Sequence, residues 1–236
     1  SISHKGSSGR VLIIGGSKNF IGAAYFAAAA AYRVGAGLVT IATPQSLVTP
    51  LSIKIPEATF IPLRESSPGV VSSNNLDLII PELSKYNALV VGCGIGQDTQ
   101  TQIFLSGLLT DINSLPQLVI DADALNWISS MPVKKRLDLI KKLNNPILTP
   151  HHGEMKRLVD ISIESNLPPR IPLIHKLSQE WNATFVLKGP YTLVGTKDGS
   201  IYINPVATPS LATAGTGDIL AGMIGGLIAQ NLSNTA

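Results

Sequence analysis

A loop of small residues, Ala214-Gly215-Thr216-Gly217-Asp218, has the composition of an anion-binding site and leads into a predicted helix over residues 219–230. The first turn of a helix has N–H groups without intrahelical partners and carries partial positive charge. Gly215 and Gly217 lack the Cβ atoms that would keep a phosphate from these amides. Asp218 stands at the mouth of the site, where a carboxylate can accept the proton of an attacking hydroxyl during phosphoryl transfer. The spacing is equally compatible with a tight turn in which Asp218 only caps the helix or favours its dipole.

Two more carboxylates follow a predicted buried strand, because residues 118–120 lead directly into Asp121 and Asp123. Ligands of open parallel sheets bind beyond the carboxyl ends of the strands, so both carboxylates are candidates for binding Mg²⁺ or a hydroxyl group. A helix-capping role could account for one of the two aspartates, but it is a weak explanation for the presence of both.

Three further polar residues, His151, Glu154 and Lys188, also follow predicted strands. His151 and His152 are adjacent, so their side chains diverge, and no HExxH pattern supplies the other ligands of a metal site. A hydrogen-bonding or proton-handling role for His151 or Glu154 is the better prediction, with a structural histidine as the alternative. Lys188 is placed to meet a phosphate, unless it is a surface lysine.

Cys93 lies among alternating glycines after a predicted strand over residues 88–91. The glycines would let the backbone approach a ligand or would simply form a tight turn. Because no base lies near it in the sequence, Cys93 is predicted to be a small filler residue and not a nucleophile.

The elements that must position these residues alternate between strands and helices. A strand over residues 10–14, a glycine turn, a helix over 22–34 and a strand over 37–42 predict a βαβ unit. Neither GxGxxG nor GxxxxGK[ST] occurs, so another kind of loop must hold any nucleotide phosphate.

The rest of the chain continues the alternation of strands and helices. Residues 44–68 are predicted to be irregular, and the basic residues 134–142 to form a solvated helix face. Further helices are predicted at 76–85, 100–109 and 173–181, strands at 147–149 and 184–187, and a hairpin between 191–195 and 200–203. Six or seven strands with chemistry at their ends predict a doubly wound α/β enzyme with one cleft.

The composition narrows the class of protein. The 236 residues are 44% hydrophobic and 14% charged, which suits one large domain with a substantial core. A net charge of +3 with 5% aromatic residues gives no case for nucleic-acid binding. One cysteine and no long apolar run predict a protein of the cytoplasm without a membrane partner.

Several segments together resemble the ADP-dependent NAD(P)H-hydrate dehydratases of the ribokinase-like superfamily. They are His4-Lys5-Gly6, Gly92-Cys93-Gly94, residues 121–125 (DADAL), 149–155 (TPHHGEM), 186–189 (VLKG) and 212–218 (ATAGTGD). The GTGD loop alone indicates the superfamily, whereas its combination with HKG and TPHxGEM is specific to the family. Proline is common in the family where His152 stands, and Gly-Asn where this chain has Ala207-Thr208.

The resemblance implies a three-layer α/β sandwich with a mostly parallel sheet, and an enzyme that repairs the 6S-hydrate of NADH or NADPH. Such an enzyme transfers a phosphoryl group from ADP to the hydroxyl at C6, after which phosphate leaves and NAD(P)H, AMP and phosphate are the products. By resemblance, Asp218 is the catalytic base, and the amides of residues 214–217, including Gly215 and Gly217, stabilise the transferring phosphoryl group. The other implied contacts are Ala23, Gly94, His151 and Asp218 with the hydrate, and Lys188, Gly189, Pro190, Tyr191, Thr192 and Gly217 with the adenine nucleotide.

The resemblance also implies Mg²⁺ with the nucleotide, ADP in preference to ATP, a homo-oligomer of four copies and a fused or separate epimerase. Residues 1–236 are expected to form one catalytic domain that lacks part of the family's C-terminal helices. Two alternatives remain: a small-molecule kinase of the hydroxymethylpyrimidine-kinase type, which would release a stable phosphate ester, and a non-catalytic nucleotide-binding module. The pairing of HKG with TPHxGEM favours the dehydratase.

Overall fold

A computed structural model describes residues 9–110, 115–160 and 167–230 of the chain. The predicted HKG motif at His4-Lys5-Gly6 lies outside the described residues. None of the helices within them has the length and hydropathy needed to cross a bilayer.

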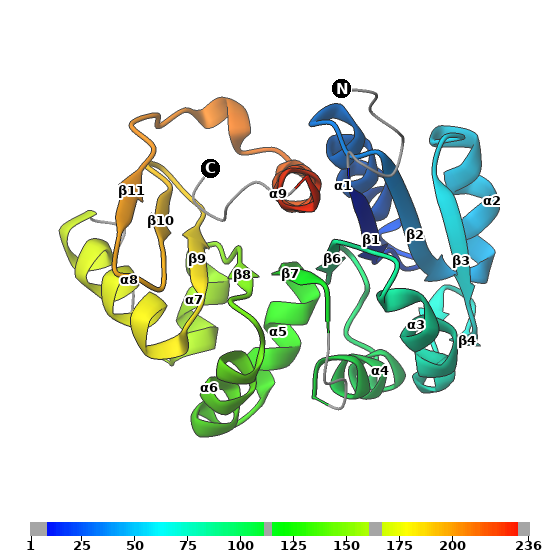
Figure 1. Ribbon diagram of the computed structural model, residues 1–236, viewed down its shortest axis with the longest axis horizontal. Helices are drawn as coiled ribbons and strands as arrows, with labels where there is room; N and C mark the ends of the chain where they lie inside the picture. Colours follow the sequence, from blue (N-terminus) through cyan, green and yellow to red (C-terminus); the bar gives the residue numbers. More distant parts are fainter. Residues whose placement is uncertain (1–8, 111–114, 161–166, 231–236) are drawn as a thin grey trace.

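The centre of the described structure is a nine-stranded sheet with the strand order β11-β10-β9-β8-β7-β6-β1-β2-β3 (Figure 1). Pairing is parallel from β3 to β9, and β10 and β11 close one edge as an antiparallel hairpin. The strands are β1 (Arg10–Ile14), β2 (Leu38–Pro44), β3 (Thr59–Leu63), β6 (Ala88–Val91), β7 (Gln117–Ile120), β8 (Ile147–Leu148), β9 (Thr184–Leu187), β10 (Leu193–Gly195) and β11 (Ile201–Ile203). A separate ribbon pairs β4 (Glu65–Ser67) with β5 (Val70–Val71).

Helices cover both faces of the sheet, which makes three layers (Figure 1). One face carries α1 (Ile21–Arg33), α2 (Gln45–Lys54) and α9 (Thr216–Ala229). The other carries α3 (Leu76–Leu83), α4 (Thr99–Thr110), α5 (Ala122–Ser130), α6 (Val133–Lys142), α7 (His152–Val159) and α8 (Leu167–Trp181). Two short 3₁₀ helices, Ser73–Asn75 and Pro209–Leu211, lie in the connections. The predicted mostly parallel α/β sandwich is therefore confirmed.

Each central strand supplies side chains to two separate cores. Val11 and Ile13 of β1 pack beneath α1 and α9, whereas Leu12 and Ile14 pack on the opposite face. Successive side chains of a strand point to opposite faces, so a strand buried on both sides reads as a continuous apolar run. That is the pattern from which this strand was predicted.

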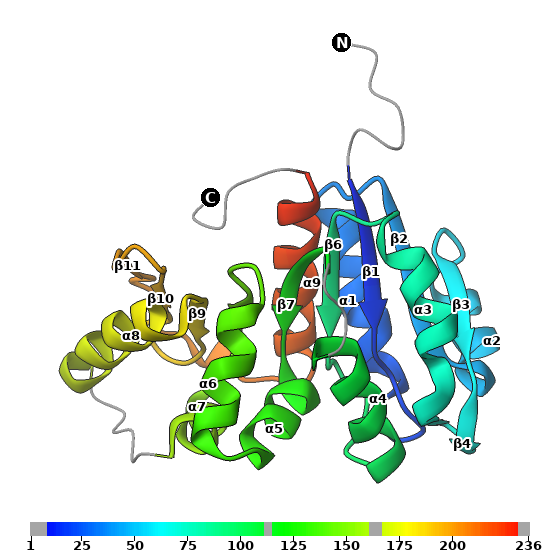
Figure 2. The same cartoon turned by 60° about the horizontal axis from the view of Figure 1, so that its bottom comes forward.

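The strand order reverses direction between β1 and β6. From β1 the chain proceeds outward to β2 and β3, whereas β6, β7, β8 and β9 follow one another in the other direction. Ligands of open α/β sheets bind outside the carboxyl ends of the strands at such a switch point. α9 begins at the edge to which the β1 arrow points, where the orange segment enters it in Figure 2.

Three expectations were wrong in detail. Residues 44–68 contain α2, β3 and part of the small ribbon, because burial of Leu47 and Leu51 against the sheet overrides the helix-breaking tendency of Pro50. The lysines of the basic helix α6 are exposed as predicted, whereas Arg136 is buried. The main sheet has nine strands and not six or seven, because β3 was hidden in a proline-rich stretch and both hairpin strands join the same sheet.

Candidate active site

The chemistry-bearing residues that follow the strands meet at one edge of the sheet, as parallel pairing requires. The turns after β1 and β6 touch at the switch point, where the Gly16 amide donates to the carbonyl oxygen of Cys93 at 2.9 Å. Beyond the next strands, His151 forms an isolated parallel bridge with Lys188. Strand ends on both sides of the switch point thus lie together at this edge.

Asp218 lies in the first turn of α9 and faces this edge. Its carboxylate, the Cys93 thiol and the Asp121 carboxylate offer three atoms that all lie within 4.8 Å of one another. Burial of Asp218 raises its pKa to about 6, and the nearby negative charge of Asp121 adds to this effect. The Cys93 thiol and Lys188 favour the ionised form and oppose the shift. A carboxylate with a pKa near neutrality is suited to accept and return a proton.

The backbone before Asp218 makes the tight approach that the sequence predicted. Gly215 caps α9 in the left-handed region, with φ at +89°. A Cβ atom there would lie 2.8 Å from the ring of Phe26, so a side chain has neither the conformation nor the space. Asp218 is not the capping residue of α9, and the reading in which it serves only as a cap loses its main support.

Lys188 is held at the cleft by two carboxylates. Its Nζ donates to Asp121 Oδ1 at 2.7 Å and lies 3.9 Å from Glu154 Oε2. Asp121 is 1% exposed and also accepts a hydrogen bond of 2.7 Å from Thr149 Oγ1. Buried charges persist when they are paired and hydrogen-bonded, so Lys188 is not a surface lysine.

Gly217 brings the start of α9 to this lysine. A Cβ atom on Gly217 would lie 3.3 Å from Lys188 Nζ and 3.8 Å from Asp121 Oδ2. The first-turn amides of α9 and a fixed ammonium group therefore face the same small space. This combination of a helix N-terminus and a lysine suits a phosphate group.

His151 is the N-cap of α7 and forms a capping box with Glu154. His151 Nδ1 accepts from the amides of Gly153 and Glu154, at 2.9 and 3.3 Å, and Glu154 Oε2 accepts from the His151 amide at 2.8 Å. Because Nδ1 accepts from these amides, the ring proton lies on Nε2, which is 3.5 Å from Glu154 Oε1. Burial raises the pKa of Glu154, against the opposing effect of Lys188. The hydrogen-bonding role predicted for His151 and Glu154 has this structural basis.

Asp123 is hydrogen-bonded to the loop after β6. Its carboxylate accepts from the Gly96 amide at 2.9 Å and from Gln97 Nε2 at 3.1 Å. The separation from Asp121 arises at Ala122, whose φ of 48° lies in the left-handed region that an alanine rarely adopts. No feature of the sequence predicts this strained residue.

The glycine after Cys93 fits against α1. A Cβ atom on Gly94, whose φ is +60°, would lie 2.6 Å from the Cβ of Ala23 and 2.7 Å from that of Phe20. The two small residues expected to contact the hydrate, Ala23 and Gly94, are therefore neighbours.

Arg170 of α8 holds the expected nucleotide loop, residues 188–192, by hydrogen bonds to its backbone. The Arg170 side chain is 1% exposed and donates to the carbonyl oxygens of Pro190 and Tyr191, at 3.1 and 2.9 Å. Tyr191 has a φ of 54°, and Thr192 Oγ1 donates to the carbonyl of Gly189 at 3.0 Å. Sequence reasoning missed Arg170, because one arginine in a polar helix carries no mark of burial.

The cluster of Cys93, Asp121 and Asp218 does not fit a resident Mg²⁺. Mg²⁺ takes oxygen ligands, and a thiol is a poor donor for it. Asp121 is already paired with Lys188, whose positive charge would repel a cation at the same oxygen. The carboxylate of Asp218 still offers an oxygen to a cation that enters with nucleotide phosphates.

Comparison with known proteins gives a consistent set of relatives. A family model described as NAD(P)H-hydrate dehydratase matches residues 11–236. The bifunctional NAD(P)H-hydrate repair enzyme Nnr of Moorella thermoacetica is 38% identical over 97% of this chain and 42% of its own length. The ADP-dependent (S)-NAD(P)H-hydrate dehydratase of Lactiplantibacillus plantarum is 36% identical over 97% of this chain and 75% of its own length. The chain thus spans less than half of the bifunctional relative.

Two solved structures share the fold. A ribokinase-like superfamily protein of Enterococcus faecalis has 29% identity and a TM-score of 0.77, covering 98% of this chain and 74% of its own. The ADP/ATP-dependent NAD(P)H-hydrate dehydratase of Bacillus subtilis, co-crystallised with ATP and Mg²⁺, has 27% identity and a TM-score of 0.75, covering 97% and 75%. The ribokinase-like architecture expected from the motifs is confirmed.

Proposed function

This chain belongs to the NAD(P)H-hydrate dehydratase family, and we propose that it dehydrates the S-hydrate of NADH or NADPH with ADP as phosphoryl donor. The products are NAD(P)H, AMP and phosphate. The observation that carries the proposal is the position of Asp218: a partly buried carboxylate with a pKa of about 6, in the first turn of α9. Lys188 Nζ lies at the same turn, beside Gly217.

The site supports a phosphoryl transfer followed by an elimination. Asp218 accepts the proton of the C6 hydroxyl, whose oxygen attacks the terminal phosphorus of ADP while the bond to AMP breaks. The first-turn amides of α9 and Lys188 stabilise the negative charge of the transferring group. The hydroxyl has become a phosphate ester, a far better leaving group. Loss of phosphate from C6 and of a proton from C5 restores the ring double bond.

The two substrates occupy opposite sides of Asp218 in this proposal. The adenine nucleotide binds at residues 188–192 and Gly217, on the loop that Arg170 supports. The hydrate lies against Ala23 and Gly94, with His151 Nε2 as a donor. Mg²⁺ would enter with the nucleotide and neutralise part of its charge.

A coupled comparison of nucleotides tests the function directly. Reduced nicotinamide absorbance should rise when the chain is given NADH hydrate and ADP, and more slowly when ATP replaces ADP. A kinase of the same fold would instead consume the hydroxyl substrate and accumulate a stable phosphate ester. A binding module would give neither product, and either result would reject the dehydratase assignment.

The partners of the domain are also proposals. The relative named as a bifunctional repair enzyme supports a second activity that works with this domain, and we propose that it is the epimerase implied by the family resemblance, fused or separate. We propose a single catalytic domain that assembles into a homo-oligomer of four copies, as the family resemblance implies. Light scattering on the purified chain would test the assembly.

A further inference from the structure

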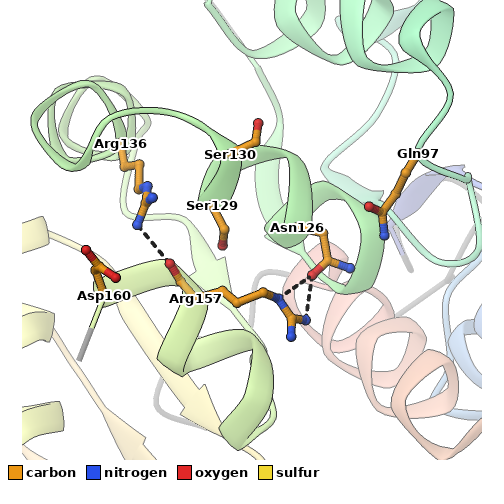
Figure 3. A pocket seen from close by; sticks show the side chains of 7 residues that line it. All are labelled: Gln97, Asn126, Ser129, Ser130, Arg136, Arg157 and Asp160. Atoms are coloured by element: carbon orange, nitrogen blue, oxygen red, sulfur yellow. Dashed lines mark hydrogen bonds between the residues drawn. The ribbon is translucent and has the colours of Figure 1, made fainter. Parts of the chain in front are cut away.

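A pocket of about 530 Å³ lies beside the expected active site, between the loop after β6 and the helices α5, α6 and α7 (Figure 3). Its described lining consists of polar residues: Gln97, Asn126, Ser129, Ser130, Arg136, Arg157 and Asp160. Most small-molecule sites are lined mainly by apolar side chains with a few polar groups. A lining made of polar residues, with two arginines and one carboxylate, fits a charged ligand, and no group of the proposed reaction occupies it.

Arg157 is the side chain in this pocket that can bind an anion. It extends back along α7, and its Nε and Nη2 donate to Asn126 Oδ1 at 3.2 and 2.7 Å (Figure 3). Its Nη1 lies 3.7 Å from the position that a Cβ atom of Gly153 would occupy. Among the residues that the structure describes, Nη1 has no hydrogen-bond acceptor. The amide of Asn126 thus orients a guanidinium group whose remaining donors are available to a ligand.

The second arginine has a different task. Arg136 Nε donates to the carbonyl of Met131, and its Nη1 donates to the carbonyls of Arg157 and Leu158, at 2.6 to 2.8 Å. These bonds satisfy carbonyl groups near the end of α7 and tie α6 to that helix. Arg136 therefore builds the wall of the pocket, and Arg157 faces its interior.

Hydrogen bonds and close neighbours connect the lining of the pocket to residues of the expected hydrate site. Gln97, which lines it, donates to Asp123 at 3.1 Å, and Asp123 begins the turn of α5 that leads to Asn126. On the other side, Gly153 belongs to the first turn of α7, which His151 caps. A Cβ atom on Gly153 would lie 2.9 Å from His151 Cε1, so the glycine keeps the space between the imidazole and Arg157 open. A molecule in contact with His151 can extend to Arg157 without leaving this edge of the sheet.

We propose that this pocket binds the phosphate-bearing part of the dinucleotide substrate, with Arg157 as its anion contact. The inference rests on the proposed function. A dinucleotide hydrate carries a ribose, a pyrophosphate and an adenosine beyond its reacting ring, and these must leave the catalytic centre in some direction. The Lys188 side is taken by the adenine nucleotide that donates the phosphoryl group. The polar pocket between α5 and α7 is lined in part by the helix that His151 caps, and it offers a guanidinium group for the pyrophosphate.

The test compares Arg157→Gln with its neighbour on the same helix. Arg157→Gln should raise KM for NADH hydrate about tenfold or more and leave kcat within about twofold, because a charged hydrogen bond is lost from binding and not from the reacting centre. Hydrated dihydronicotinamide riboside, which lacks phosphate, should be turned over equally by variant and parent. Lys156→Gln removes a positive charge from an exposed residue outside the pocket lining. It should change the KM neither for NADH hydrate nor for the phosphate-free substrate.

A binding measurement separates this inference from the proposed function. Calorimetric titration with NADH hydrate in the absence of ADP should show about tenfold weaker binding to Arg157→Gln than to the parent, and no change for Lys156→Gln. A parent that turns over the hydrate, together with an Arg157→Gln variant of unchanged KM and affinity, overturns the pocket assignment alone. An equal loss on the phosphate-free substrate also overturns it. A parent that neither binds nor converts the hydrate refutes the proposed function itself.

Discussion

The two helical layers of this protein pack against the two faces of one sheet, and they differ in the size of their side chains. On one face α1 and α9 meet through alanine and glycine: a Cβ atom on Gly222 would overlap the carbonyl oxygen of Ala27. On the other face the core is made of large side chains such as Phe104, Leu105 and Trp181. α9 carries Asp218, so the small residues bring the turn that holds this carboxylate close to the strand ends. The large residues of the other layer stabilise the fold by burying apolar surface, but the position of the Asp218 carboxylate depends less directly on them.

The polar groups at the strand ends divide in the same way. On the side of α5 and α7, Asp121, Thr149, Glu154 and Lys188 form one paired network. Asp218, carried by α9, is instead buried beside another carboxylate, and its pKa rises to about 6. One layer therefore supplies a stable charged framework, and the other supplies a group poised to exchange a proton.

The largest effect should come from Asp218→Asn. Removal of a general base costs roughly 10²–10⁴-fold, so we expect turnover of NADH hydrate to fall on the order of a thousandfold. The variant should remain folded, as checked by circular dichroism and thermal melting. Turnover near that of the parent in a folded variant would remove Asp218 from its role.

Phe104→Ala tests the layer of large side chains. Phe104 is fully buried on α4, and such truncations cost about 3–5 kcal/mol. The free energy of unfolding should fall by that amount in urea titrations. The molecules that stay folded should keep kcat within about threefold, because α4 carries none of the expected catalytic groups. A large loss of kcat at full folding would show that the two layers are not separate in their roles.

Gly222→Ala tests the layer of small residues with a single methyl group. The new Cβ meets the backbone of Ala27, so we expect roughly 1–3 kcal/mol of destabilisation. It should also lower kcat, because the displaced α9 carries Asp218 away from the strand ends. Gly22→Ala is the matched control, since its Cβ would make only an ordinary 3.7 Å contact with Phe26. That change should be neutral or stabilising by about 0.5–1 kcal/mol.

The pH dependence probes the environment of Asp218. Its pKa is raised in the folded state, so the folded protein binds more protons than the unfolded chain between about pH 4 and 6. Stability therefore falls as pH rises through this window, by about 1–2 kcal/mol after allowance for partial exposure, and is then level. Asp218→Asn should reduce this slope in denaturant titrations and leave the part due to Glu154, whose pKa burial also raises. Catalysis needs the ionised base, so kcat/KM of the parent should decline below about pH 6.

Cys93→Ala should have the smallest effect. The thiol hydrogen-bonds to Asp218 and favours its ionised form, so its removal should raise the pKa of Asp218 further. The acidic limb of the pH profile should move up by less than about one unit. An unmoved limb would show that the thiol only fills space, as the sequence suggested.

The sequence predicted most of the fold because the central strands are buried on both faces and helices alternate with them along the chain. Continuous apolar runs such as residues 88–91 are typical of parallel strands, and the observed β6 begins and ends at those residues. The prediction failed at α2 and β3. Prolines in this stretch indicated irregular structure, whereas Leu47 and Leu51 of α2 are buried by contacts that the local sequence does not reveal.

The site was predictable as a list of residues but not as an arrangement. By itself the sequence determined that glycine, carboxylate, histidine and lysine would collect at the carboxyl ends of parallel strands, because chain order and strand direction require it. Only the tertiary structure decided that Asp121 pairs with Lys188 whereas Asp218 is left with a raised pKa. It also decided that Arg170 is buried under the nucleotide loop and that Arg157 faces a polar pocket. These outcomes depend on distances of a few ångströms between segments remote in the chain, and burial and charge interactions are set by those distances.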